Sequence, residues 1–263
     1  MAVLTKENAV NLGKRTALVT GAGRGIGRAV ALGLARSGAR VAVLARSTEQ
    51  VEETVRLIDD AGGVGLAVPA DVTDDVATRA ALTRIVDTFG PVEVLVGNAA
   101  VVQPLGPSRT IDPVEWATAI AVNLTAVARL NLAVLPAMLD QGWGRIVTVS
   151  SAVVTRPASM IGGNAYVTSK AALEAHSLNL AAELADTGVT VNVYRPGAVD
   201  TAMQEWIRDQ DGTGFPALHQ RFHRMHEEGV LITPEQSAAA LPARLAGAET
   251  GQIWNVDDAV PQR

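Results

Sequence analysis

The chain has 263 residues, 48% apolar and 19% charged, so it can bury the core of one large or two small globular domains and is not a disordered chain. Its formal net charge of −5 argues against a broadly basic nucleic-acid-binding surface. No cysteine is present, which excludes disulfides, thiolate metal ligands and a thiol nucleophile. The polar opening Met1–Asn8 lacks the apolar core of a signal peptide, and no apolar run is long enough to span a membrane. We therefore expect a cytoplasmic protein without membrane contacts.

Short apolar runs alternate with amphipathic stretches along the chain. We expect buried strands at 16–20, 40–45, 64–68, 92–96, 145–150, 189–194 and 252–256. Helical spacing lies between them, at about 26–37, 48–61, 74–89, 112–140 (bent near Pro136), 165–186 and 234–246. This alternation predicts an α/β fold, a single doubly wound parallel β-sheet (a Rossmann fold) with helices on both faces. With no linker or repeat, we expect one domain over residues 1–263.

The regular alternation weakens between Ala202 and Gly229. This segment follows the carboxyl end of a strand, where open α/β sheets bind ligands, so it is either a substrate lid or a helical excursion packed on the rim. It holds three of the four histidines, His219, His223 and His226, which would face one way on a helix. No carboxylate pattern completes a metal site, so we expect solvated histidines and no metal.

A glycine-rich turn, Thr20 to Gly27, joins the first strand to the first helix. Its spacing is Gly-x-x-x-Gly-x-Gly rather than the common Gly-x-Gly-x-x-Gly. Glycines at such a turn let the backbone approach a pyrophosphate, and the following helix supplies free amides and a positive end. The alternative is a glycine-rich turn with no ligand.

A tyrosine and a lysine, Tyr166 and Lys170, lie four residues apart in a predicted helix and so share one face. An ammonium near a phenol favours the phenolate and lowers the pKa of the tyrosine, which makes it usable for proton transfer near neutral pH. Taken alone, the pair is better interpreted as a surface tyrosine beside a lysine whose stem covers apolar surface, because this spacing often arises by chance.

Together the glycine turn and the Tyr166-x-x-x-Lys170 pair resemble the two signatures of the short-chain dehydrogenase/reductase family. The resemblance runs from about Leu12 to Val256. Further matching segments occur in the family's order, at Asp71-Val72, Gly97-Asn98-Ala99-Ala100, Val122-Asn123-Leu124, Ser150-Ser151 and Pro196-Gly197-Ala198-Val199-Asp200-Thr201. The segment between Ser151 and Tyr166 is about two residues longer than is common in the family.

The resemblance implies a catalytic set of Asn123, Ser151, Tyr166 and Lys170. Tyr166 would be the general acid in ketone reduction, and Lys170 would bind the nicotinamide ribose. Ser151, preferred over Ser150, would donate a hydrogen bond to the substrate oxygen, and Asn123 would hold a water that passes protons to Lys170. For Asn123 alone, a local side-chain bond to helix backbone is the simpler interpretation.

The resemblance also implies a dinucleotide site. Its residues would be Gly21, Arg24, Gly25, Ile26, Gly27, Arg46, Ser47, Asp71, Val72, Asn98, Ala99, Tyr166, Lys170, Pro196, Gly197, Val199 and Thr201. The second strand ends in Leu44-Ala45-Arg46-Ser47, without the acidic residue that would bond the adenosine ribose and repel a 2′-phosphate. Arg46 and Arg24 would instead form a cradle for that phosphate, unless both are ordinary solvated side chains. We therefore expect NADPH/NADP+ rather than NADH/NAD+.

These expectations lead to an NADPH-dependent oxidoreductase that reduces a ketone or ketoacyl carbonyl of a small, partly apolar molecule. One rival is an NAD-dependent alcohol or hydroxysteroid-type dehydrogenase. A rival of another class is a non-catalytic dinucleotide-sensing protein, which would be expected to lack part of the Ser-Tyr-Lys set. By resemblance, we expect a homo-oligomer, a dimer or tetramer, formed through the helices at about 112–140 and 165–186.

Overall fold

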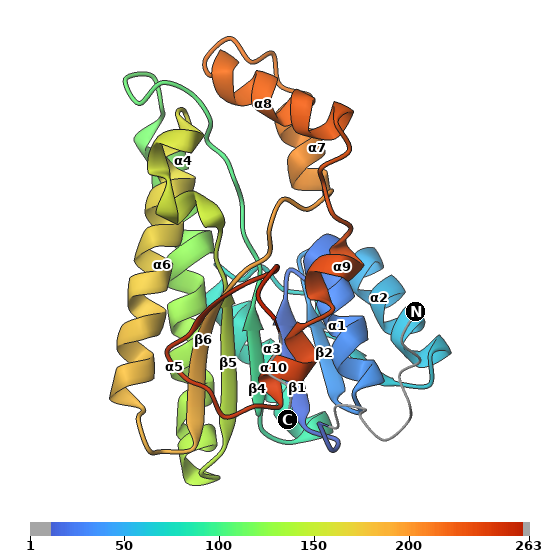
Figure 1. Cartoon of the computed structure of the whole chain (residues 1–263). Helices are drawn as coiled ribbons and strands as arrows, with labels where there is room; N and C mark the ends of the chain where they lie inside the picture. Colours follow the sequence, from blue (N-terminus) through green and yellow to red (C-terminus); the bar gives the residue numbers. More distant parts are fainter. Residues whose placement is uncertain (1–11, 260–263) are drawn as a thin grey trace.

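The computed structural model describes residues 12–259, so the opening Met1–Asn8 lies outside the described residues. Seven parallel strands form one sheet in the order β3-β2-β1-β4-β5-β6-β7 (Figure 1). Their bounds are β1 Thr16–Thr20, β2 Arg40–Leu44, β3 Val64–Ala67, β4 Val94–Gly97, β5 Gly144–Val149, β6 Val189–Arg195 and β7 Ile253–Asn255. The predicted doubly wound parallel fold is therefore confirmed, with strand ends shifted by one or two residues.

Helices cover both faces of the sheet, and successive strand residues point to opposite faces. On one face, Val19 and Val43 pack with α1 (Gly25–Arg36), α2 (Thr48–Asp60), α9 (Pro234–Ala238) and α10 (Leu241–Leu245). On the other, Leu18 and Leu95 pack with α3 (Asp75–Phe89), α5 (Ala126–Asp140) and α6 (Asn164–Glu183). Burial on both faces explains why the strands read as continuous apolar runs.

The strand order reverses between β1 and β4, because the chain leaves β1 toward β2 on one side and later returns to β4 on the other. The loops after these two strands diverge at that point and leave a crevice at the carboxyl ends of the strands. The glycine turn follows β1, and the Asn98-Ala99 turn follows β4. The fold thus brings together two segments that are almost 80 residues apart in sequence.

The long helix expected over 112–140 is not regular. It consists of α4 (Pro113–Ile120), a π-helical turn (Ala121–Thr125) and α5, while Pro136 lies inside α5. We expected an irregularity near Pro136, but it occurs thirteen residues earlier, around Asn123, where the side chain bonds outside its own helix. A π-turn of this kind has no proline or glycine signal in the sequence.

Residues 202–229 form two helices, α7 (Ala202–Arg208) and α8 (Pro216–Glu227), which stand beyond the sheet at the top of Figure 1. They pack through Ile207, Phe215 and Leu218 on Val102 and Met160. The helix expected over 234–246 is broken into α9 and α10, because Pro242 cannot continue the preceding turn.

We expected no run long enough to span a membrane, and by length and composition that expectation is wrong for one helical run in the described part of the chain, Pro113–Asp140, with a mean hydropathy of 1.6. Its inward face, which includes Leu130, Val134 and Met138, belongs to the core beneath the sheet.

Candidate active site

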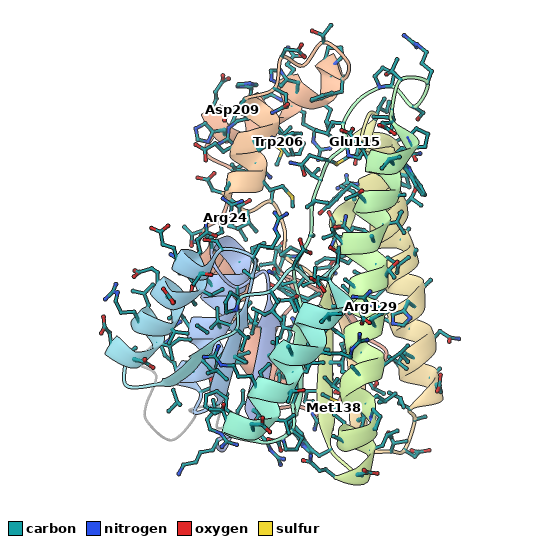
Figure 2. All side chains as sticks on the ribbon, turned by 180° about the vertical axis from the view of Figure 1, so that it is seen from behind. Arg24, Glu115, Arg129, Met138, Trp206 and Asp209 are labelled. Atoms are coloured by element: carbon teal, nitrogen blue, oxygen red, sulfur yellow. The ribbon has the colours of Figure 1, made fainter. Side chains whose placement is uncertain are left out.

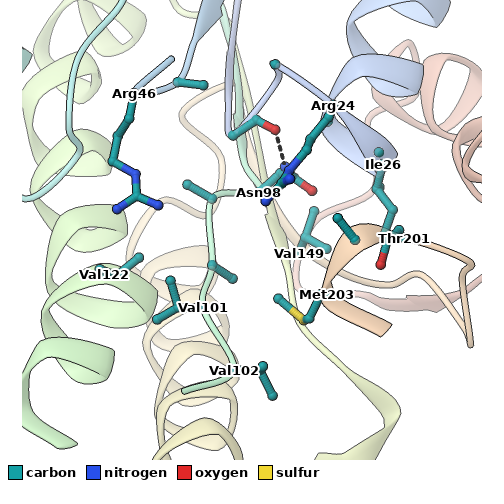
Figure 3. A pocket seen from close by; sticks show the side chains of 18 of the residues that line it. Arg24, Ile26, Arg46, Asn98, Val101, Val102, Val122, Val149, Thr201 and Met203 are labelled. Carbon is teal, nitrogen blue, oxygen red and sulfur yellow. Dashed lines mark hydrogen bonds between the residues drawn. The ribbon is translucent and has the colours of Figure 1, made fainter. Parts of the chain in front are cut away.

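A cavity with a volume of about 840 Å³ lies at the carboxyl ends of β1, β2, β4 and β5. The close view in Figure 3 shows Arg46 and Arg24 at the upper part of this cavity, with Val101, Val102 and Met203 below them. Charged groups therefore lie at one part of the cavity and aliphatic groups at another. This division suits a ligand with an anionic part and an apolar part.

The glycine turn packs too tightly for side chains. A Cβ at Gly27 would overlap the carbonyl of Gly21 and the side-chain amide of Asn98, and a Cβ at Gly21 would lie 2.9 Å from Ala99 Cα. The same Asn98 amide nitrogen donates to Thr20 O at 2.9 Å, and the Thr20 hydroxyl accepts from the Asn98 and Ala99 amides at 3.0 Å. These bonds fasten the turn after β4 to the turn after β1.

Helix α1 begins directly at this turn with Gly25, whose φ is +54°. Its N-cap, Arg24, makes no side-chain capping bond, and the first turn of the helix carries no acidic side chain. The first amides of the helix therefore have no side-chain acceptor and face the cavity as an anion-binding end. This arrangement fits a pyrophosphate.

Arg46 lies across the cavity from this turn, in the loop after β2, and close to Asp71. Burial acts to raise the pKa of Asp71, but bonds from the Thr73 hydroxyl and amide, together with the charge of Arg46, outweigh it and leave the pKa lowered. The hydroxyl of Ser47 accepts the amide of Gln50 at 3.3 Å and caps α2. Arg46 is exposed, so its guanidinium has room to meet a phosphate.

Tyr166 lies in the first turn of α6 and lines the cavity. Burial raises the pKa of its phenol, and a hydrogen bond with the Ser151 side chain only partly offsets this effect. We expected Lys170 to lower this pKa, and that expectation is not met in the described geometry. The Lys170 ammonium lies 5.8 Å from the centre of the Tyr166 ring and is directed at a main-chain carbonyl.

Lys170, one turn further along α6, is buried with 2% exposure. Its ammonium donates to Val149 O at 2.7 Å. Burial lowers the pKa of Lys170 to about 8, and the nearby charge of Glu174 opposes that shift. A lysine with a pKa this close to neutrality exchanges protons readily.

Glu174 continues the same face of α6 and is itself buried. Its carboxylate accepts two bonds from Arg195, at 2.8 and 2.7 Å, and one from the hydroxyl of Ser150 at 2.7 Å. Ser150 thus lines the cavity and bonds Glu174, whereas Ser151, the serine preferred from the sequence, bonds the side chain of Tyr166. Sequence reasoning missed Glu174, although its place one turn beyond Lys170 was a usable signal.

Asn123 is fully buried in the π-helical turn. Its side-chain oxygen accepts the amide of Val101 at 2.8 Å, and its side-chain nitrogen donates to Val101 O at 2.8 Å and to Ser169 Oγ at 3.0 Å. These contacts are not the local bond to its own helix that the residue taken alone suggests, and the role of Asn123 in holding a water stays a prediction. The side chain instead fastens the loop after β4 to α6, because a buried amide must satisfy both its groups.

Residues 15–212 match the family model "short chain dehydrogenase". The chain is 37% identical over 248 residues to the short-chain reductase protein NovJ of Streptomyces niveus, covering 93% of each chain. It is 39% identical over 209 residues to the 3-oxoacyl-acyl-carrier-protein reductase FabG of Escherichia coli, covering 79% of this chain and 83% of that one.

The chain is a short-chain dehydrogenase/reductase. It is therefore an NAD(P)-dependent oxidoreductase, and the resemblance seen in the sequence is confirmed. Among solved structures, it is similar to a gluconate 5-dehydrogenase of Beutenbergia cavernae with bound NADP, at a TM-score of 0.82, 34% identity, and 95% and 97% coverage. It is also similar to a variant of actinorhodin polyketide ketoreductase with NADPH. The TM-score is 0.80 and the identity 32%, and the match covers 92% of this chain and 95% of that one.

Most residues expected to bind the dinucleotide line the cavity of this short-chain dehydrogenase/reductase. They are Gly21, Arg24, Gly25, Ile26, Gly27, Arg46, Ser47, Asp71, Val72, Asn98, Ala99, Tyr166, Lys170, Pro196 and Thr201. Gly197, Val199, Asn123 and Ser151 are not on its wall. Gly197 packs against Val256, and Val199 is buried beside Ile232.

Several wall residues were not singled out from the sequence. They are Gly23, Ala45, Gln50, Ala70, Val122, Val149, Met203, Glu205, Trp206 and Asp209. The last four belong to α7 and its end, so the segment 202–229 both packs on the rim and borders the cavity. Figure 2 shows Trp206 of α7 and Glu115 of α4 on either side of the open top of the molecule.

Proposed function

We propose that this enzyme uses NADPH to reduce the carbonyl group of a ketone or ketoacyl compound to an alcohol. The observation that carries the proposal is the position of Tyr166 and Lys170 on the wall of the same cavity that the glycine turn and Arg46 line. The similarity to proteins named as reductases supports the direction of the reaction.

The catalytic roles follow from the contacts. NADPH supplies the hydride when bound. Tyr166 donates its proton to the substrate oxygen, and the raised pKa of its phenol keeps that proton in place until the oxygen becomes basic. Ser151 bonds the Tyr166 side chain in the free enzyme, and when substrate binds its single hydroxyl proton turns to the substrate oxygen, where negative charge develops. Lys170 holds the ribose with the ammonium donors that Val149 leaves free.

Asn123 is a positioning residue in this proposal. It holds Val101, which lines the cavity, and Ser169, which lies next to Lys170 in α6. Loss of its amide would displace the wall of the substrate space rather than remove a reacting group.

The preference for NADPH rests on Arg46 and Arg24. Both are exposed at the cavity, and no acidic residue follows β2 at the place where it would repel a 2′-phosphate. Gly197, Val199 and Thr201, in the turn after β6, complete the proposed dinucleotide site, with Pro196 and Thr201 on the cavity wall.

The test is oxidation of NADPH across a chemically diverse panel of ketones and ketoesters. We expect turnover with NADPH and weaker turnover with NADH, and we expect Arg46→Asp to reverse that preference. The control is Arg79→Asp, which changes an exposed arginine of α3 away from the cavity. A preference for NADH in the unchanged chain would favour the NAD-linked dehydrogenase instead. Tight NADPH binding without turnover of any carbonyl would favour the dinucleotide sensor.

We further propose a cytoplasmic homo-oligomer that acts on a small, partly apolar carbonyl compound. The oligomer would use the outward faces of α5 and α6, where Leu132 is 60% exposed and Leu139 is 40% exposed. Exposed alanines, Ala171 and Ala175, would allow close approach of α6 to a second copy. Light scattering of the full chain tests the association.

A further inference from the structure

Two histidines of α8 meet the end of α7. His219 Nε2 lies 2.9 Å from Arg208 O, His223 Nε2 lies 3.1 Å from the same oxygen, and the two nitrogens are 3.3 Å apart. Both side chains are partly buried, so the expectation of solvated histidines fails for them; His226, one turn further along, is exposed as expected. Their partial burial follows from the packing of α8 on the end of α7.

The oxygen of Arg208 is free to take such partners because it is the last carbonyl of α7. The two following amides, of Asp209 and Gln210, turn back to Glu205 and Ile207 instead. Within residues 12–259, this oxygen has hydrogen bonds only with the two imidazoles. Carbonyls at a helix end need partners from outside the helix, and they also carry its negative end.

The imidazole of His219 is held in place from both sides. A Cβ at Gly212, whose φ is +70°, would lie 2.6 Å from His219 Cγ, so the loop backbone packs directly on the ring. The ring of Phe215 meets it edge-on, with ring centres 6.2 Å apart. His219 and His223 are themselves edge-on, with ring centres 4.5 Å apart. A ligand set with fixed side chains binds a cation without first having to be ordered.

The three atoms have the spacing of metal ligands. With metal–nitrogen and metal–oxygen distances of about 2.1 Å, their separations of 2.9, 3.1 and 3.3 Å correspond to angles of roughly 87–104° at a common centre. Imidazole nitrogens at i and i+4 of a helix, joined by one oxygen, suit a zinc-class divalent ion.

We propose that His219, His223 and the main-chain oxygen of Arg208 form a binding site for a divalent transition metal such as Zn²⁺ or Ni²⁺, with water in the remaining positions. No three His, Cys, Asp or Glu side chains among residues 12–259 lie together as a metal-binding group, and the third ligand of the proposed site is a backbone oxygen. The sequence led us to expect no metal because only side-chain ligands can be recognised in it.

The bound ion would fasten α8 to α7. Met203, Trp206 and Asp209 of α7 and its end line the cavity, whereas Arg208 does not. The metal would therefore not touch the reacting groups, and it would act on the rigidity of the wall that covers them. All three ligands are neutral and the guanidinium of Arg208 is on the same residue, so we expect micromolar rather than nanomolar affinity.

The test is calorimetric titration of the tag-free, chelator-treated full chain with Ni²⁺ and Zn²⁺. We expect one ion per chain and a rise in melting temperature. His219→Ala and His223→Ala should each weaken binding at least tenfold, while His226→Ala, which changes an exposed histidine of the same helix, should leave it unchanged. His219→Gln should also lose binding, although its amide retains a donor for the Arg208 oxygen.

Absence of saturable binding at millimolar metal would overturn the proposal and leave the two histidines as caps of α7. An equal loss in His226→Ala would overturn it as well, because that result means dispersed surface binding. If the alanine variants fail to fold, the unchanged chain decides the question. In proton NMR of the unchanged chain with Co²⁺, the imidazole resonances of His219 and His223 must broaden first among the four histidines. Earlier broadening of any other pair refutes the site.

Discussion

Replacing Glu174 by glutamine removes the charge that accepts three hydrogen bonds from Arg195 and Ser150, one turn beyond the catalytic lysine. The side chains of Arg195 and Glu174 are 12% and 7% exposed, so this ion pair is well shielded from water. Removing one partner of a buried pair costs about 3–5 kcal/mol. Glutamine keeps the size and one acceptor of glutamate, so we expect the lower end, about 3 kcal/mol, which corresponds to a fall in melting temperature of roughly 6–12 °C.

The same substitution should change the pH dependence of the reaction. The pKa of Lys170 is about 8, and the charge of Glu174 acts to raise it. Without that charge the pKa falls, so Lys170 loses its proton at lower pH. We therefore expect the alkaline limb of the kcat/KM profile for ketone reduction to move to lower pH in Glu174→Gln.

Urea denaturation and a pH profile of kcat/KM check both expectations. Glu183→Gln is the matched control, because Glu183 is exposed on the same helix. The reasoning is refuted if Glu174→Gln is as stable as the unchanged chain, or if its alkaline limb stays in place while the control behaves identically.

Three further predictions follow from the packing. Gly27→Ala should abolish NADPH binding measured by fluorescence, because the new methyl group overlaps Gly21 O and the Asn98 amide. Gly33→Ala in the same helix is the control and should bind NADPH normally, because its nearest new contact is 3.4 Å away. Asn123→Ala leaves the two main-chain groups of Val101 unpaired, so it should lower the free energy of unfolding by about 3 kcal/mol. It should also raise KM more than it lowers kcat. An unchanged urea midpoint would contradict this prediction. For Lys170, the folded-state pKa of about 8 lies below the ordinary 10.5, so the unfolded chain binds more protons between these values. The free energy of unfolding should therefore rise as pH increases from 8 to 10.5, and this gain should be lost as pH falls toward 8. The Lys170→Met variant should lack the rise. If the urea midpoints of both proteins change with pH in parallel, the prediction is wrong.

The sheet was predictable because its signal is local and repeated. Strands buried on both faces read as apolar runs such as Thr16–Thr20, and each is followed by a helix with its own stop signal, such as Ser37-Gly38. The glycine turn was predictable for a similar reason, since its spacing encodes a backbone path. Most element ends differed by one or two residues, which is within the fraying of helix and strand ends, and α6 ended three residues earlier than expected.

The features that sequence reasoning missed all depend on contacts between distant segments. The π-helical turn at Asn123 is set by its bonds to Val101, twenty-two residues away, and not by local propensity. The partner of Glu174 is Arg195 on a different element, and the meeting of His219 with Arg208 requires the return of α8 onto α7. The raised pKa of Tyr166 has the same origin, because burial is a property of the fold and helical spacing alone suggested the opposite shift.

The most direct test of the central claim is the rate of NADPH-dependent ketone reduction by Tyr166→Phe, with Tyr194→Phe as control. Tyr194 is the only other tyrosine, and its hydroxyl bonds Ser237 O in the core, away from the cavity. We predict that Tyr166→Phe binds NADPH normally and loses about 10²–10⁴-fold in kcat, as expected for removal of a general acid, while Tyr194→Phe keeps its kcat. A Tyr166→Phe enzyme that reduces its substrate at the rate of the unchanged chain would contradict the account.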